Sequence, residues 1–239
     1  MTPGLNSLSA FLHRNIAALL DLIYPPVCAV CQNIIEGQRD FHLICHQCLG
    51  NCEPVPTRFI RTDILNRLRP CYIDNMYIAI CFDQTVQTVI HHIKYEKMNH
   101  LAYRFARWAE KFLTTELRAL DAEYVVPVPL HPARRKERGY NQSLFIARGF
   151  FHSGPVSIRE EILIRSRNTR SQTALNRDER KENVTDAFVV ADAECVKGCH
   201  VILVDDVITT GATINECARI LKKSGAAKVS ALALATPVE

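Results

Sequence analysis

The chain has 239 residues, of which 48% are hydrophobic and 23% charged, a composition that fits one sizeable α/β domain plus a small module. The net charge of +4 is mild, but residues 131–181 hold twelve Lys or Arg against five Asp or Glu, so we expect an anionic partner there. No apolar run approaches the roughly 20 residues of a membrane span, and polar residues interrupt the N-terminal apolar pattern, which argues against a signal peptide. We therefore expect a cytoplasmic protein.

Residues 1–24 are expected to contain an amphipathic helix. Apolar residues recur at helical spacing from Leu8 to Ile23, and Pro25 and Pro26 end the pattern. The polar face is not strongly basic, so we expect this helix to pack against the protein rather than to lie on a membrane.

A cysteine-rich module is expected at residues 25–56. It holds two Cys-x-x-Cys pairs separated by thirteen residues, and each pair can present two thiolates to one metal ion. A single pair could be a redox site, whereas two pairs at this spacing favour zinc. Four protein ligands leave no open position on the metal, so the predicted site is structural rather than catalytic. Its ligands are Cys28, Cys31, Cys45 and Cys48.

The remaining chain, residues 57–239, is predicted to form one α/β domain. Residues 54–72 contain prolines and arginines and are interpreted as a connector, and MYIAICF at 76–82 is a predicted strand. Apolar residues keep a helical period over residues 86–112, which predicts two helices.

A second predicted strand, YVVPVPL at 124–130, leads into a basic segment. The prolines end the strand and predict a rigid exit loop. The loop that follows, HPARRKERGYNQS, precedes a predicted helix at 142–150. Basic loops are often only solvated, but this one leaves the end of a buried strand, where open α/β sheets bind ligands. We therefore interpret it as part of an anion site, with candidates Pro129, Leu130, Arg134, Arg135 and Arg138.

A long polar segment lies between the next two predicted strands, residues 162–164 and 188–190. It runs for about twenty residues without apolar periodicity, which is typical of a lid or of disorder inside a compact domain. Its polar side chains could close over an anion and exclude water. The candidates are Arg165, Arg167, Arg170 and Gln172.

The most informative stretch is VILVDDVITTGAT at residues 201–213. It begins with a short apolar run, largely β-branched, that is typical of a strand buried on both faces. Asp205 and Asp206 come next, where the strand leaves the sheet, and they suit ribose hydroxyls or a divalent metal. The hydroxyl-rich turn Thr209–Thr213 then leads into a helix, whose first N–H groups can face a phosphate. We infer that one loop holds a sugar phosphate.

These elements predict the fold class. Buried apolar strands alternate with helical segments, and residues 228–235 supply a last strand. The expected architecture is an α/β fold with an open, mostly parallel sheet and helices on both faces, preceded by the small cysteine module.

DDVITTGAT resembles the phosphoribosyl pyrophosphate (PRPP) signature of type I phosphoribosyltransferases. From about Asp21 to Thr236 the chain resembles the ComF family of phosphoribosyltransferase-like proteins. The resemblance is carried by DLIYPPVCAVC at 21–31, VPVPL with RGYNQ at 138–142, and the segment from Arg165 through RKEN at 180–183. Lys94 and Tyr95 match a Lys-Tyr pair of that family.

The resemblance implies a type I phosphoribosyltransferase-like fold and a role in natural transformation, where imported single-stranded DNA is handled in the cytoplasm. It implies a PRPP site with Mg²⁺, in which Asp205 and Asp206 meet the ribose and the metal. The 5′-phosphate would lie on Thr209, Thr210, Gly211, Ala212 and Thr213. The pyrophosphate would lie beside Lys94 and the exit loop, with Pro129, Leu130, Arg134, Arg135 and Arg138.

One position departs from the purine-type enzymes. They carry an aspartate in the 5′-phosphate loop that takes part in proton transfer with the base, and the matching residue here is Thr209. A neutral hydroxyl cannot act as a base at neutral pH, so purine salvage is disfavoured. The loop is more similar to those of the orotate and amidotransferase branches.

Three functions remain open at this point. The first is a glycosyltransferase that moves phosphoribosyl from PRPP to an unknown acceptor and releases pyrophosphate. The second is a non-catalytic PRPP sensor or adaptor that docks to DNA-uptake or recombination proteins through the zinc module. The third, direct binding of single-stranded DNA by the basic segment, ranks lower because the aromatic residues there follow a helical pattern rather than a stacking platform.

Overall fold

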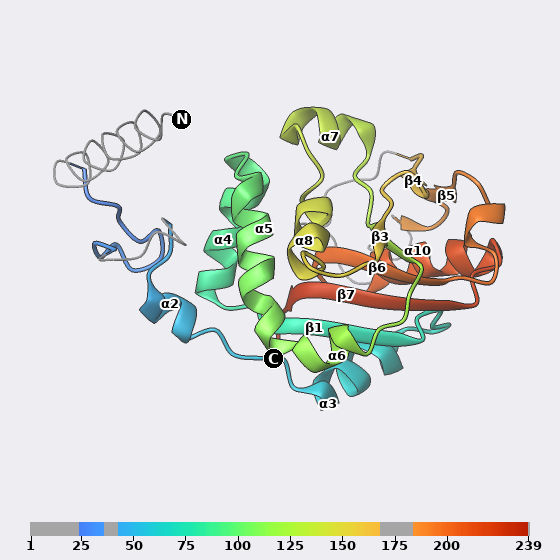
Figure 1. Cartoon of the computed structure of the whole chain (residues 1–239), viewed down its shortest axis with the longest axis horizontal. Helices are drawn as coiled ribbons and strands as arrows, with labels where there is room; N and C mark the ends of the chain where they lie inside the picture. The colour runs from blue at the N-terminus through green and yellow to red at the C-terminus, as the bar shows by residue number, and fades with distance from the viewer. Residues whose placement is uncertain (1–23, 36–42, 168–183, 239) are drawn as a thin grey trace, which may run out of the picture. The chain divides into compact units, whose positions relative to one another are not determined.

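The computed structural model describes residues 24–35, 43–167 and 184–238 (Figure 1). The chain divides into two compact units, Met1–Asn51 and Cys52–Glu239. The helix expected at residues 8–23 lies outside the described residues, as does most of the expected lid. In the described part of the chain, no helix is long and apolar enough to cross a membrane.

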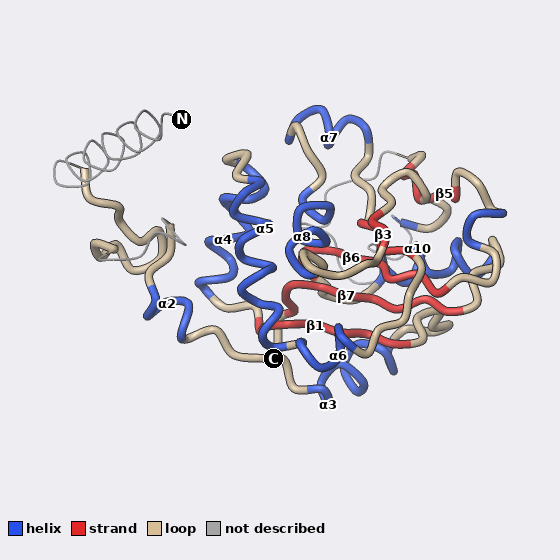
Figure 2. Tube along the Cα trace, in the orientation of Figure 1, coloured by secondary structure: helices blue, strands red, loops and turns tan. Residues whose placement is uncertain are grey.

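A five-stranded parallel sheet forms the centre of the larger unit, and its long strands run side by side in Figure 2. The strand order is β1-β7-β6-β2-β3, so the last two of these strands in sequence lie between β1 and β2. Every neighbouring pair is parallel, which confirms the predicted sheet. The strands are β1 (Asn75–Cys81), β2 (Tyr124–Pro127), β3 (Ser157–Ile158), β6 (His200–Val207) and β7 (Lys228–Thr236).

Helices cover both faces of this sheet, because successive side chains of a strand point to opposite sides. On one face Val201 and Leu203 of β6 share a hydrophobic core with Cys217 and Leu221 of α10 (Ala212–Lys223). The opposite face of β6 contacts α8 (Gln142–Phe150). Farther from the sheet, α5 (Asn99–Ala109) packs on α8, and α4 (Gln84–Tyr95) runs beside α5 (Figure 1).

The interpretation of residues 54–72 as a connector is wrong, because much of this segment is helical. It contains α3 (Thr57–Phe59), a π-helical turn (Ile60–Ile64) and a 3-10 turn (Leu65–Arg67). The cause is visible in its apolar spacing: Ile60 and Ile64 lie one turn apart, and both are buried in the hydrophobic core that α10 also joins.

The basic loop after β2 is also partly helical, as α7 (Pro132–Arg138). His131 caps this helix through Nδ1, which accepts from the N–H of Ala133 at 3.2 Å, and Pro132 supplies a preset φ in the first turn. Gly139 ends it with φ +83°, a left-handed conformation that glycine adopts without strain. The expectation of a loop at these residues is therefore wrong, although the sequence carries helix signals in Pro132 near the start and Gly139 after the end.

Two further strands form an antiparallel pair beside the main sheet. They are β4 (Leu163–Arg165) and β5 (Phe188–Val190), which match the strands predicted around the polar segment. The remaining described helices are short: α2 (His46–Gly50), α6 (Thr114–Arg118) and the 3-10 turns Glu110–Phe112 and Glu194–Val196.

Gly149 sets the close approach of α8 to α5, and replacing it with Ala is expected to destabilise the larger unit by roughly 1–3 kcal/mol. A Cβ at this position would lie 2.4 Å from the carbonyl oxygen of Tyr103 and 2.7 Å from Cβ of Ala106, so the helices would have to separate. Chemical denaturation measures the loss. Gly154→Ala is the matched control, because a Cβ there meets nothing within 4 Å. Equal stability of the two variants would contradict this account of the packing.

Candidate functional site

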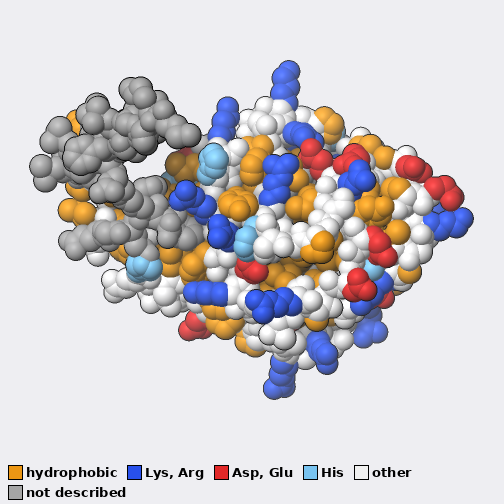
Figure 3. Space-filling view, in the orientation of Figure 1, with side chains coloured by type: hydrophobic (Ala, Val, Ile, Leu, Met, Phe, Trp, Pro, Cys, Tyr) orange, Lys and Arg blue, Asp and Glu red, His pale blue; other side chains and the backbone are white. Residues whose placement is uncertain are grey.

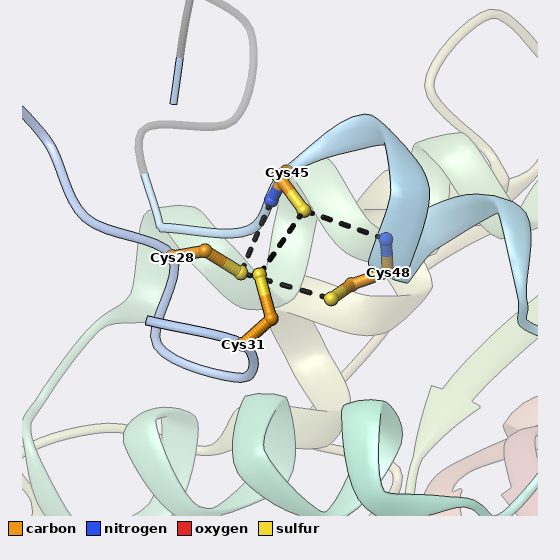
Figure 4. A group of neighbouring side chains, drawn as sticks. All are labelled: Cys28, Cys31, Cys45 and Cys48. Carbon is orange, nitrogen blue, oxygen red and sulfur yellow. Dashed lines mark hydrogen bonds between the residues drawn. The ribbon is translucent and has the colours of Figure 1, made fainter. Parts of the chain in front are cut away.

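Four cysteine side chains converge in the smaller unit, as the sequence predicted (Figure 4). Their sulfur atoms all lie within 4.8 Å of one another, and the pairs Cys28–Cys48 and Cys31–Cys45 are 3.8 and 3.7 Å apart. Tetrahedral zinc with Zn–S bonds of about 2.3 Å requires sulfur separations of roughly 3.8 Å. The N–H groups of Cys45 and Cys48 point at Cys28 Sγ (3.4 Å) and Cys45 Sγ (3.5 Å), where they would stabilise thiolates. The four cysteines therefore fit a metal such as zinc.

A pocket of about 440 Å³ opens in the larger unit at the carboxyl ends of the parallel strands. This is the edge at which open α/β sheets bind ligands. The end of β6 and the turn that follows it form one wall, and the exit from β2, α7 and α4 contribute the others. Most predicted site residues line it: Lys94, Pro129, Leu130, Arg134, Arg138, Arg165, Asp205, Asp206 and Thr209–Thr213.

The two acidic residues lie near the end of strand β6, in the pocket lining, and differ in their partners. The structure extends β6 to Val207, so both acids are part of the strand rather than following it. Asp206 is only 5% exposed, and its Oδ2 lies 2.8 Å from Nζ of Lys94. Oδ1 of Asp205 accepts from Oγ of Ser143 (3.1 Å) and from the N–H of Asp206 (2.9 Å). Burial, and then the neighbouring Asp206 carboxylate, raise the pKa of Asp205 to about 7. Adjacent carboxylates of this kind suit an oxygen-seeking divalent cation such as Mg²⁺.

The turn after β6 presents backbone N–H groups and hydroxyls to the pocket. Gly211 has φ +76° and precedes α10, whose first residues Ala212 and Thr213 line the pocket, so the positive end of the dipole of a twelve-residue helix lies at this wall. A Cβ on Gly211 would meet side-chain atoms of Leu68 (3.2 Å) and Ile64 (3.3 Å), so the helical segment missed by sequence reasoning supports this turn from behind. Helix N-termini of this form bind phosphate.

The RGYNQS segment at 138–143 connects three walls of the pocket. The hydroxyl of Tyr140 donates to the carbonyl of Ile93 in α4, and the buried Asn141 caps α8 while its Nδ2 donates to the carbonyl of Val128 (3.1 Å). Ser143 then holds Asp205. Sequence reasoning used this segment only as a family motif, and Ser143 was missed because no local spacing rule links it to an acid 62 residues away.

Of the basic candidates after β2, the structure places Arg134 and Arg138 in the pocket lining but not Arg135. Lys and Arg side chains stand out in blue over the region of α7 in Figure 3. Arg134 and Arg138 line the pocket, and NH1 of Arg138 donates to Oε1 of Gln142 at 2.9 Å. Arg135 is not part of the lining; its guanidinium lies 3.2 Å from Glu160. The prediction that Arg135 faces the anion therefore has no support in the pocket geometry.

The lid candidates are only partly described. Arg165 ends β4 in the pocket lining, where burial lowers its pKa while Cys217 and Asp205 oppose that shift. Arg167 is not part of the lining, and its NH2 donates to the carbonyl of Thr185 at 2.7 Å. Arg170 and Gln172 lie outside the described residues.

Residues 145–238 match the family described as the phosphoribosyl transferase domain. Among curated proteins, the chain is 31% identical over 144 residues to the DNA utilization protein YhgH of Salmonella typhimurium, with 59% of this chain and 63% of that protein covered. The chain thus spans less than two thirds of that relative.

Two relatives carry competence names. Competence protein F of Haemophilus influenzae is 29% identical over 170 residues, covering 68% of this chain and 72% of that protein. Competence protein ComFC of Streptococcus pneumoniae is 34% identical over 125 residues, covering 52% of each chain. The matched phosphoribosyl transferase domain agrees with the observed parallel sheet flanked by helices.

Proposed function

We propose that this chain, which belongs to the ComF family of phosphoribosyltransferase-like proteins, binds PRPP with Mg²⁺ and transfers its phosphoribosyl group to an acceptor. One observation carries the proposal: the acid pair Asp205–Asp206 and the N-terminal turn of α10 line the same pocket. A bound ribose 5-phosphate would contact the acid pair with its hydroxyls and the helix start with its phosphate, so both must line one pocket. From the competence and DNA utilization names of its relatives, we propose that this activity serves DNA uptake in natural transformation.

In this proposal each wall of the pocket takes one part of PRPP. Thr209–Thr213 and the α10 N-terminus hold the 5′-phosphate, and Asp205 and Asp206 hold the ribose hydroxyls. Arg134 and Arg138, on the exit from β2, face the pyrophosphate. Bound Mg²⁺ would supply positive charge to the pyrophosphate and the ribose oxygens.

The chemistry is a displacement at C1 of the ribose. The bond from C1 to the pyrophosphate oxygen breaks, a nucleophile of the acceptor bonds to C1, and the pyrophosphate leaves with the bonding electrons. The arginines stabilise the leaving charge, and Arg165, which lines the pocket, is proposed to help exclude water from the reacting carbon. The chain then needs no strong base of its own, which agrees with the hydroxyl of Thr209 in place of an acid.

Calorimetric titration of PRPP with Mg²⁺ into the full chain tests the binding step. We expect one site per chain, and no heat of binding would contradict the proposal. Pyrophosphate release above the spontaneous rate tests the transfer step. Binding without release, under any acceptor supplied, would favour the second candidate: a PRPP sensor or adaptor that docks to DNA-uptake or recombination proteins.

Direct binding of single-stranded DNA is a lesser candidate. The exposed basic side chains of α7, such as Lys136, favour it because they could contact phosphates. The ion pair between Arg135 and Glu160 argues against it, because that pair already neutralises one of these charges. DNA affinity that falls steeply with salt and persists in excess PRPP would support it, whereas competition by PRPP would assign the DNA signal to the pocket.

We further propose that the four-cysteine cluster holds structural zinc and that the protein acts in the cytoplasm. Thiolates bind metal rather than pairing as disulfides in a reducing compartment. The cluster uses all four zinc positions for protein ligands, so it stabilises its own unit and takes no part in the chemistry.

A further inference from the structure

Lys94 brings a positive charge to the acid pair of the pocket. It lies in the last turn of α4, and its Nζ is 2.8 Å from Oδ2 of Asp206. The side chain of Lys94 is 24% exposed and that of Asp206 only 7%, so this ion pair is largely shielded from water. Burying a carboxylate costs free energy unless a cation compensates its charge. Lys94 supplies that compensation for Asp206.

The remaining oxygens of the pair that have partners are bonded by neutral groups. Oδ1 of Asp206 accepts from the N–H of Val207 at 2.7 Å. Oδ1 of Asp205 accepts from Ser143 and from the N–H of Asp206. In the described part of the chain, no hydrogen bond from another group reaches Oδ2 of Asp206, so the ammonium of Lys94 is its partner. The charge of Asp206 therefore depends on Lys94.

The backbone of Lys94 is held in place, whereas its side chain is able to move. The carbonyl of the preceding Ile93, which is fully buried, accepts from the hydroxyl of Tyr140. On the same turn, Nδ1 of His92 lies 2.7 Å from Oε2 of Glu96. These contacts fix the end of α4. Because the aliphatic stem of lysine is flexible, the ammonium can leave the acid pair while the helix stays where it is.

An ammonium and a divalent cation exclude each other from one carboxylate oxygen. Mg²⁺ binds carboxylate oxygens at about 2.0–2.1 Å. With the ammonium 2.8 Å from Oδ2 of Asp206, the two cations would repel each other strongly in a site shielded from water. Free Mg²⁺ must therefore displace Lys94 and leave its charge without an anion. A complex of Mg²⁺ with a diphosphate brings both charges at once, the cation for Asp206 and the anion for Lys94.

We propose that Lys94 determines which form of the cation this pocket accepts: it holds Asp206 against free Mg²⁺ and releases it when the diphosphate of the ligand draws the ammonium away. This inference rests on the proposed function in one respect, because it takes the acid pair as the place of the cation. No covalent bond changes. The ion pair of Lys94 with Asp206 is exchanged for one between Asp206 and the cation and one between Lys94 and the diphosphate. Lys94 is thus a specificity-determining residue that couples entry of the metal to entry of the ligand.

Binding of free Mn²⁺, a probe for Mg²⁺, to the full chain purified with zinc is measured without PRPP by electron paramagnetic resonance of the unbound ion. Lys94→Met is expected to bind about one Mn²⁺ at least about tenfold more tightly than the parent chain, because the ion no longer has to break a bond between charged groups. Adding Asp206→Asn to Lys94→Met should remove the gained site. Lys94→Arg keeps the charge and should exclude Mn²⁺ as the parent does.

Lys223→Met is the matched control, since it removes the same charge from an exposed position in the last turn of α10, outside the pocket lining. Its Mn²⁺ affinity should equal that of the parent chain. When PRPP is added, the Mn²⁺ affinity of the parent should rise more than that of Lys94→Met. Thermal melting verifies that each variant is folded.

The outcomes separate the inference from the proposed function. Equal affinity of the parent and Lys94→Met for free Mn²⁺, or Mn²⁺ binding by Lys94→Arg that matches Lys94→Met, overturns the role of Lys94 even if PRPP binds. If Lys94→Met does not fold, tight binding of free Mn²⁺ by the parent would still overturn it, and binding that is tight only with PRPP would support it. The titrations of free Mn²⁺ contain no PRPP, so failure of PRPP to bind would contradict the proposed function and leave exclusion of the free cation to be decided by its own result.

Discussion

Replacing both acids of the pocket, Asp205→Asn together with Asp206→Asn, is expected to lower the affinity for PRPP with Mg²⁺ by more than about a hundredfold. Hydrogen bonds that involve a charged group contribute about 1.5–3 kcal/mol each, so the loss of two costs at least about 3 kcal/mol. Asparagine keeps the shape of aspartate, and its oxygen can still accept from Ser143, so the variant should fold. Calorimetric titration measures the affinity, and thermal melting with circular dichroism verifies the fold.

Asp192→Asn is the matched control for this experiment. Oδ1 of Asp192 accepts from the N–H of Glu194 at 3.0 Å, on the turn after β5, and the residue is not part of the pocket lining. Its variant should bind PRPP like the parent chain. A folded double variant that keeps its PRPP affinity within about twofold would show that PRPP binds elsewhere.

The strands and the acid pair could be predicted from sequence because their signals are local. A run such as Val201–Val204 is apolar on both of its faces, and the strand that it predicts carries Asp205 and Asp206 to the open edge of the sheet wherever its neighbours lie. The order β1-β7-β6-β2-β3 was not predicted, because strand pairing depends on contacts between residues far apart in the chain.

The parts of the site that escaped prediction are those made by distant partners. Ser143 reaches Asp205 across 62 residues, and Oδ1 of Asn215 in α10 accepts from the N–H of Tyr72 across 143. Whether a polar residue joins a pocket or faces solvent depends on such pairings. Arg135 illustrates this. It lies between Arg134 and Arg138 in the sequence, but its guanidinium pairs with Glu160, which sequence spacing does not predict.

The helical segment at residues 57–67 was missed for a different reason. Its prolines and arginines suggested a connector, and only two isoleucines, Ile60 and Ile64, carry the helical spacing. The contact of Ile64 and Leu68 with the position of Gly211 explains why this segment is structured: it buries apolar side chains against the turn that contains Gly211. Tertiary packing thus decided the outcome over local composition.

Cys45→Ser is expected to abolish stable zinc binding and to unfold the smaller unit while the larger unit stays folded. In the described part of the smaller unit the large buried apolar side chains are chiefly Ile35, Ile44 and Leu49, and small cores of this kind usually need a metal or a disulfide for stability. Structural zinc contributes about 10–16 kcal/mol in zinc-finger peptides, so we expect folding of the unit to depend on the metal. Native mass spectrometry should find about one zinc per parent chain and none in the variant. Limited proteolysis should then cleave the variant within residues 24–51 and spare the sheet.

Cys71→Ser is the matched control, since Cys71 is exposed and lies outside the four-cysteine cluster. It should keep its zinc and its protease resistance, because its Sγ contacts only the carbonyl of Ile73 among the bonds described for it. Full zinc occupancy in Cys45→Ser, or loss of zinc in Cys71→Ser, would show that the metal has a different ligand set. PRPP affinity of the Cys45→Ser variant adds a separate result: since the pocket lining lies wholly within residues 82–214, affinity close to that of the parent chain is expected even after the smaller unit has unfolded.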